Sequence, residues 1–251
     1  MQQAQVLYRE GRLTESIDSL RAHLRDCPSD KRARSFLFEL LCFAGEFDRA
    51  RKQLMILAED SKDSRLGVAF YFAALAAEVE RQAYYEEGIA YEAAEGPGEQ
   101  AATGEITGTF NGKRFTGIRD LDSRLGGSLE FLAAGKYHRI RFGDVKRIEI
   151  AGPKHVRDLY WLPAKLEMTE AMGSAELESI LVPVLYPQTH LFDDDRTRLG
   201  RATEWAAIEN GMEIPLGQRV LAISGEEVPL LEVRSIEFDP RPEEAGKVSN
   251  G

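Results

Sequence analysis

The first third of the chain has the spacing of apolar residues that amphipathic helices need. Apolar side chains recur three and four residues apart, with charged side chains between them. This pattern predicts helices near 3–10, 14–26, 31–44 and 47–59. A stretch rich in Ala, Glu, Tyr and Phe follows from about 62 to 95 and predicts one long helix or two.

The same region repeats itself at an offset of 34 residues. At this offset Gly11 falls on Gly45, and Ser16 falls on Ala50. The glycines lie where a tight turn would join two helices, and the small residues lie where paired helices would cross closely. A period of 34 residues is typical of tetratricopeptide (TPR) units, so the pattern predicts a short TPR-like array of helical hairpins.

The pattern changes to that of short strands after a Gly- and Pro-containing break at 95–99. Two β-type runs, 106–110 and 114–118, flank Asn111 and Gly112, the dipeptide that most strongly signals a hairpin. Further strands are predicted at 128–132, 137–142, 145–150, 159–168, 178–185, 217–223 and 228–238, with a hairpin turn at 225–227.

The rest of the second part has weaker signals. Residues 189–212 are charged and irregular, with a helical turn expected near 204–209, and the chain after 239 is expected to be a polar, frayed tail. Short strands with glycine turns predict a strongly bent sheet or a small open barrel. The sequence therefore predicts an α+β chain of two domains: a TPR-like helical domain over 1–98, a β-rich domain over 99–240, and a tail over 241–251.

Composition narrows the possible functions. The chain has 42 acidic and 32 basic residues, a net charge of −10, which argues against nucleic-acid binding. The longest uncharged apolar run, 66–77, has 12 residues, whereas a membrane span needs roughly 20. The first residues lack the features of an export signal, and two cysteines are too few for a disulfide framework. We therefore expect a cytoplasmic protein that does not bind membranes.

Motifs for catalysis, metals or cofactors are absent from the sequence. The four histidines, His23, His138, His155 and His190, do not form a metal-binding pattern, and no phosphate-binding glycine loop occurs. The acidic run 193–195 lacks the spaced ligands of a calcium loop, so we expect a solvated turn there. The sequence predicts no catalytic residue, no metal and no cofactor.

Two segments are dense in charged and aromatic residues. In the first, Asp120 and Asp122 are either a catalytic acid pair or, as we favour, members of an intrachain network with Arg119 or Arg124.

In the second segment, Arg157, Tyr160 and Trp161 are the residue types that dominate protein interfaces. Alternation along a strand predicts that one of the two aromatic residues is buried and that the other lies at the surface.

The chain resembles a known family through motifs in both parts. These motifs are RSFLFELLCFAG at 34–45, RDLD at 119–122, RLG at 124–126, GKY at 135–137, RDLYWLPA at 157–164 and VPVLYP at 182–187. With them the chain resembles the ImpE family, also called TagJ or SciE, whose members are accessory proteins of bacterial type VI secretion. The resemblance extends over nearly the whole chain.

The resemblance implies a non-catalytic cytoplasmic adaptor. Such a protein would bind the N-terminal helix of the small contractile-sheath subunit (TssB) and would thereby be linked to the ClpV AAA+ ATPase that recycles the sheath. A helical ligand needs an apolar groove. One candidate surface carries Phe38 and Leu41, for which we favour ordinary helix–helix core, and the other carries Tyr137, Arg157 and Trp161. The net negative charge favours a basic partner helix.

Two other functions remain as alternatives. An enzyme of unknown reaction would use a cluster of Asp120, Asp122, Arg157 and Asp158, and would need a pocket in which these groups converge. A generic TPR adaptor for an extended C-terminal peptide would need a basic carboxylate clamp on the concave helical face.

Overall fold

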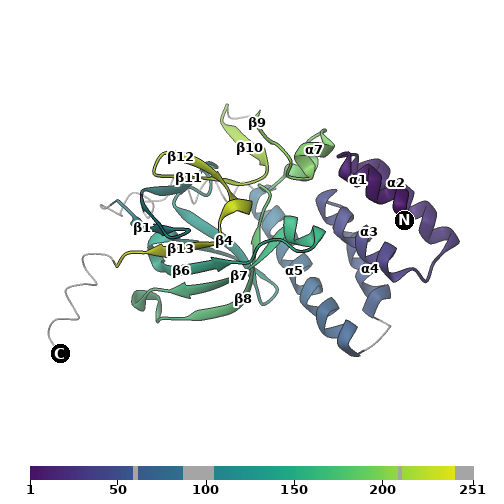
Figure 1. Ribbon diagram of the computed structural model, residues 1–251, viewed down its shortest axis with the longest axis horizontal. Coiled ribbons are helices and arrows are strands. Elements are labelled where there is room, and N and C mark those ends of the chain that lie inside the picture. Colours follow the sequence, from purple (N-terminus) through teal and green to yellow (C-terminus); the bar gives the residue numbers. More distant parts are fainter. Residues whose placement is uncertain (59–61, 87–104, 209–210, 241–251) are drawn as a thin grey trace.

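The computed structural model describes residues 1–58, 62–86, 105–208 and 211–240. Helices come first and a β-rich part follows, as Figure 1 shows. This order confirms the α+β prediction. The predicted break at 95–99 and the predicted polar tail over 241–251 lie outside the described residues.

The helical part follows the predicted pattern. Its bounds are α1 Gln2–Arg9, α2 Leu13–Asp26, α3 Lys31–Phe43, α4 Phe47–Ala58 and α5 Lys62–Glu86. Each helix packs against the next one in the chain. The first four agree closely with the helices expected from apolar spacing, and α5 is the long helix expected after them.

Turn and crossing residues of the repeat occupy the expected places. Gly11 and Gly45 end α1 and α3 with φ of 82° and 69°, in the left-handed region that glycine adopts without strain. At the crossings, Ala50 is fully buried and the Ser16 hydroxyl donates a hydrogen bond to the Ala4 carbonyl at 2.7 Å. Asp30 caps α3 by accepting a hydrogen bond from the Ala33 amide at 3.0 Å.

An open, eight-stranded antiparallel sheet forms the centre of the β-rich part. In spatial order its strands are β2 Lys113–Thr116, β1 Thr107–Phe110, β13 Ser235–Phe238, β6 Val145–Ile150, β7 Trp161–Met168, β8 Glu176–Pro183, β4 Ser128–Ala133 and β5 Lys136–Arg141. The predicted hairpin at Asn111 and Gly112 joins β1 to β2. Register shifts along both sides of β7 mark bulges, which increase the local twist.

Two small sheets flank the large one. The first pairs β3 Ile118–Asp120 with β11 Val220–Ile223 and β11 with β12 Glu226–Pro229. The second pairs β9 Thr203–Ala207 with β10 Glu213–Gly217, next to the short helix α7 Asp195–Arg198.

Two predictions in the last part of the chain are wrong. The helical turn expected near 204–209 is strand β9, and the helical turn lies earlier, in α7. The single strand expected over 228–238 is divided into β12 and β13 by the turn Leu230–Glu232. Its apolar pattern continues because Leu230 is buried within the turn. The predicted hairpin turn at 225–227 is present between β11 and β12, about one residue earlier, at Ser224 and Gly225.

The two parts of the chain share one buried apolar cluster. It extends from Ala4 and Leu41 in the helices through Leu75 of α5 to Leu162 and Ile236 in the sheet. Helix α5 contacts α4 as well as β4 and β5, and Figure 1 shows it between the other helices and the sheet. No helix among the described residues has the length and apolarity to span a bilayer.

Candidate partner-binding surface

Four of the six predicted binding residues are buried. Phe38, Leu41, Tyr160 and Trp161 are between 1% and 6% exposed. Leu41 belongs to the core between helices, as favoured from the sequence. These four side chains therefore offer a partner little surface of their own.

The aromatic pair corrects the prediction that one member lies at the surface. The ring of Tyr160 packs edge-on against Phe43 of α3 at 5.1 Å between centroids, and Trp161 Nε1 donates to Glu78 Oε2 at 3.0 Å. Tyr160 ends the 3-10 turn Val156–Leu159, and only Trp161 belongs to β7. Strand alternation does not apply to residues on both sides of such a boundary.

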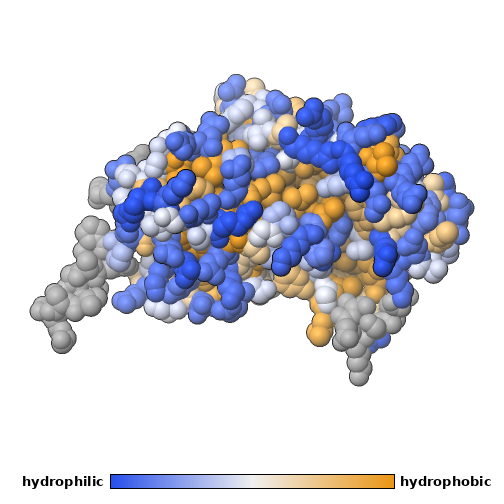
Figure 2. Space-filling view, viewed as in Figure 1, coloured by the Kyte–Doolittle hydropathy of each residue, from blue (hydrophilic) through white to orange (hydrophobic). Residues whose placement is uncertain are grey.

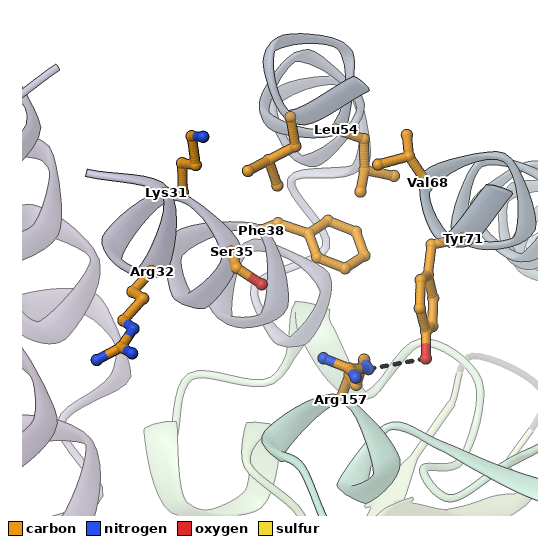
Figure 3. Close-up of a pocket in the computed structure, with 10 residues that line it drawn as sticks. Lys31, Arg32, Ser35, Phe38, Leu54, Val68, Tyr71 and Arg157 are labelled. Carbon is orange, nitrogen blue, oxygen red and sulfur yellow. Dashed lines mark hydrogen bonds between the residues drawn. The ribbon is translucent and has the colours of Figure 1, made fainter. Parts of the chain in front are cut away.

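Phe38 lines a groove of about 350 Å³ between α3, α4 and α5. Figure 3 shows its ring pointing from α3 toward α5, between Leu54 and Tyr71. Gly67 of α5 also lines the groove, and a Cβ atom built there would meet no atom within 4 Å. The groove therefore has an apolar wall and space on its α5 side.

Arg157 forms the polar end of this groove and joins the β-rich part to the helices. Its Nε donates to the Tyr71 hydroxyl at 2.7 Å, and its Nη1 donates to Glu39 Oε1 at 2.9 Å. Burial raises the pKa of Glu39, and the positive charge of Arg157 opposes that shift. Arg157 thus holds α3, α5 and the 3-10 turn Val156–Leu159 together beside the open groove.

Exposed apolar side chains occur on the helices that form the groove. On α5, Leu66 is 77% exposed and Phe70 is 40% exposed; on α4, Met55 and Ile56 are about half exposed. Figure 2 shows hydrophobic residues at the surface on the helical side of the molecule. Several exposed apolar side chains on two neighbouring helices are typical of an interaction surface.

Tyr137 belongs to a buried ionic network rather than to a free surface. Its hydroxyl donates to Glu130 Oε2 at 3.2 Å, and Glu130 also pairs with Arg81 of α5 at 2.6 Å. Arg81 in turn pairs with Glu78 at 2.9 Å, one turn earlier on the same helix. The network fixes the second half of α5 on the sheet.

Arg219 extends the network to the RDLD segment. It lies 2.8 Å from Asp120 and 3.2 Å from Glu130, and all three side chains are fully buried. Burial opposes ionisation of Glu130, but Arg81 and Arg219 outweigh it and lower its pKa to about 2. Asp120 has only a share of Arg219, and burial raises its pKa to about 6.

The predicted catalytic cluster divides into separate pairs. Asp122 pairs with Arg124 at 2.7 Å, as the network interpretation expected, whereas Asp120 pairs with Arg219 instead of Arg119. Asp158 accepts hydrogen bonds from the backbone amides of residues 154 and 155. The structure therefore does not bring Asp120, Asp122, Arg157 and Asp158 to one pocket.

The acidic run 193–195 has a structural role that the sequence did not indicate. Asp194 caps α7 by accepting from the amide and hydroxyl of Thr197, and Asp195 accepts from the amide and hydroxyl of Thr14 at the start of α2. Among the described residues no group of three or more His, Cys, Asp and Glu side chains is placed to hold a metal ion. Asp195 thus connects α7 to the helical part.

Sequence reasoning missed Glu78, Arg81, Glu130 and Arg219, and most of the groove. One signal was available. Glu78 and Arg81 interrupt the alanine-rich face of a long helix at an i, i+3 spacing, which places them on the same side. Their partners lie far away in sequence, so the spacing alone does not identify them.

The comparisons with known proteins agree over most of the chain. The family model described as ImpE protein matches residues 112–237. The type VI secretion system accessory component TagJ of Pseudomonas aeruginosa is 32% identical, over 94% of this chain and 91% of that protein. An X-ray crystal structure of a Vibrio parahaemolyticus protein shares the fold at 20% identity, with a TM-score of 0.78, over 96% of this chain and 99% of that one. The chain belongs to the ImpE family.

Proposed function

We propose that this chain is a non-catalytic cytoplasmic adaptor of a type VI secretion system. In this proposal it binds the N-terminal helix of the small sheath subunit TssB and is thereby linked to sheath recycling by ClpV. The similarity to a TagJ protein, described as an accessory component of that system, supports the assignment to type VI secretion. The groove between α3, α4 and α5 is the observation that carries the binding role.

The groove has the properties that a helical ligand requires. An amphipathic helix inserts apolar side chains at i, i+3, i+4 and i+7 into an apolar channel. Phe38, Leu54, Leu57 and Val68 form such a wall. Phe38 thus enters the proposal as a wall of the groove. Leu41 is buried in the helical core.

We also propose that residues 1–98 form a TPR-like unit and residues 99–240 form a second domain. Glycine turns at equivalent positions of α1–α2 and α3–α4 support the first unit. The shared apolar cluster and the ionic network show how closely the two parts are joined. In this proposal the β-rich part stabilises the short array and presents Arg157 to the groove.

The test is isothermal titration of the full chain with a peptide of the N-terminal helix of the co-encoded small sheath subunit. We expect binding at micromolar concentrations. Gly67→Leu places a side chain in the open groove and should therefore weaken binding about tenfold or more. A tenfold loss of affinity corresponds to about 1.4 kcal/mol. Ala76→Leu is the matched control, because Ala76 is exposed on the same helix and does not line the groove.

Three results separate the hypotheses. Absence of any heat or competition at micromolar concentrations contradicts the adaptor proposal. Equal binding by the Gly67→Leu and Ala76→Leu variants contradicts the groove and moves the site elsewhere. Loss of binding in Tyr137→Phe with retention in Gly67→Leu would favour the predicted surface on the β-rich part, because Tyr137 is half-buried there.

A further inference from the structure

A second cleft, of about 540 Å³, adjoins the groove on the other side of α3. It lies between α1, α3 and the segment 154–157, and it shares Arg32, Ser35 and Arg157 with the groove. Figure 3 shows Arg32 pointing away from the Phe38 ring. The groove and the cleft therefore lie on different faces of α3.

Cations predominate around this cleft. Arg9 of α1, Arg32 of α3, and Lys154 and Arg157 of the β-rich part line it, and Glu39 is the acidic residue among its lining residues. This local excess of positive charge occurs on a chain whose net charge is −10. The charge of the whole chain therefore does not describe this face, and the expectation of a basic partner helix does not fit it.

The carboxylates near the cleft are already engaged. Glu39 is 8% exposed and pairs with Arg157 at 2.9 Å. Asp158 is buried and accepts from the amides of residues 154 and 155. Arg9, Arg32 and Lys154 are exposed, and their side chains form no ion pair with any residue that the structure describes.

The cleft also has an apolar base. Phe36 is 8% exposed, and its ring packs edge-on against Tyr8 at 5.6 Å between centroids. Met1 and Val156 add apolar surface beside them. The cleft therefore combines an aromatic base with cations from three separate elements of the chain.

We propose that this cleft binds an acidic segment of a protein partner. Carboxylates of the segment pair with Arg9, Arg32 and Lys154, and an apolar side chain between them packs against Tyr8 and Phe36. Charge complementarity selects such a partner and accelerates its association. The mixed lining favours a peptide over a small anion. The backbone amide of residue 155, at the nearby 3-10 turn, already donates to Asp158 and is not available to an anion. Arg9, Arg32 and Lys154 are exposed, so they are spread over a surface rather than gathered around one buried point. The proposal stands whether or not a sheath helix occupies the neighbouring groove.

The experiment is fluorescence anisotropy of the full chain with a short labelled peptide that alternates Glu with Leu and Ala. A second peptide replaces each Glu by Gln, and a third replaces each Glu by Lys. The test variant is the double substitution Arg9→Gln and Lys154→Gln, since both residues line the cleft and not the groove. Its matched control is Arg25→Gln with Lys113→Gln, which removes the same charge from exposed sites outside both cavities.

We expect the Glu peptide to bind more tightly than the Gln and Lys peptides, and to lose affinity as salt is added. The cleft variant should weaken it about fivefold to tenfold, whereas the control pair and Gly67→Leu leave it unchanged. Equal affinity for the Glu and Gln peptides, or equal binding by the cleft variant and its control, overturns the proposal. Tight binding of tripolyphosphate without binding of the Glu peptide also overturns it, in favour of a small anion.

Discussion

The two halves of α5 differ in exposure and in the kind of side chain they carry. In the first half, Leu66 and Phe70 are exposed and Gly67 leaves space beside an apolar groove. In the second half, Glu78 and Arg81 are at most 1% exposed. Arg81 forms an ion pair with Glu130 of β4, and Glu78 pairs with Arg81 and accepts a hydrogen bond from Trp161 of β7. The first half of α5 thus presents exposed apolar side chains, whereas the second half is buried against the sheet by charged side chains.

The difference shows which contacts hold the molecule together and which remain available. Buried ion pairs tolerate little change, because removing one partner leaves a charge without water or a counter-ion. Exposed apolar side chains tolerate substitution, and burying them against a partner lowers the free energy of the complex. We therefore expect substitutions in the second half of α5 to affect stability, and substitutions in the first half to affect binding.

The largest expected effect is that of Arg81→Met. Arg81 donates to Glu78, to both carboxylate oxygens of Glu130 and to the Leu185 carbonyl. Methionine has a similar length but leaves two buried carboxylates short of a cation. The free energy of unfolding should fall by about 3–5 kcal/mol. Urea titration followed by circular dichroism measures it.

The control for this substitution is Arg114→Met. Arg114 also pairs with a carboxylate, Asp239, at 2.6 Å, but the two side chains are 64% and 40% exposed. Exposed pairs contribute little to stability, since solvent screens them, so this variant should unfold at nearly the same urea concentration as the wild type. A similar loss of stability in both variants would show that the buried network has no special role.

The next effect concerns pH and the count of charges in the network. Three carboxylates, Glu78, Glu130 and Asp120, face two guanidiniums, Arg81 and Arg219. Burial raises the pKa of Asp120 from 3.8 to about 6, so the folded chain holds a proton there that the unfolded chain has lost. The contribution of Asp120 to stability is thus fully present below pH 3.8 and is lost as the pH rises through 6.

This contribution is measured as a difference between the wild type and Asp120→Asn. Between about pH 6 and pH 4 the wild type should gain on the order of 2 kcal/mol relative to the variant, because only the wild type takes up the proton. The pKa of Glu130, lowered to about 2, acts in the opposite sense and at lower pH, below about 4.5. A difference that does not vary between pH 4 and 6 would assign Asp120 an ordinary pKa.

The sequence predicted the helices well because apolar spacing reports which face of a helix is buried. Gly11 and Gly45 also marked their turns correctly, since a left-handed backbone restricts the residue type. The groove was only partly predictable. Phe38 was a candidate from the sequence. The rest of the groove's lining includes Val68 and Tyr71 of α5, which lie near Phe38 only in the folded chain.

The ionic network could not be predicted for a related reason. Glu130 lies 49 residues after Arg81, and Asp120 lies 99 residues before Arg219. Charged residues in a sequence usually indicate positions exposed to solvent. Nothing in the local sequence distinguishes the buried Arg219 from an exposed arginine. Trp161 shows the same difficulty, because its burial depends on Glu78 of α5 accepting its indole N–H.

The smallest stability effect is expected at Gly67, where it has the opposite sign. Glycine inside a helix costs about 0.5–1 kcal/mol relative to good helix formers, and a side chain at this position meets no neighbouring atom. Gly67→Leu should therefore raise the free energy of unfolding by up to about 1 kcal/mol, measured by urea titration, although it obstructs the groove. A glycine that lowers stability and leaves an apolar groove open is expected where the groove receives a partner. Destabilisation by Gly67→Leu would instead show that the first half of α5 is packed as tightly as the second.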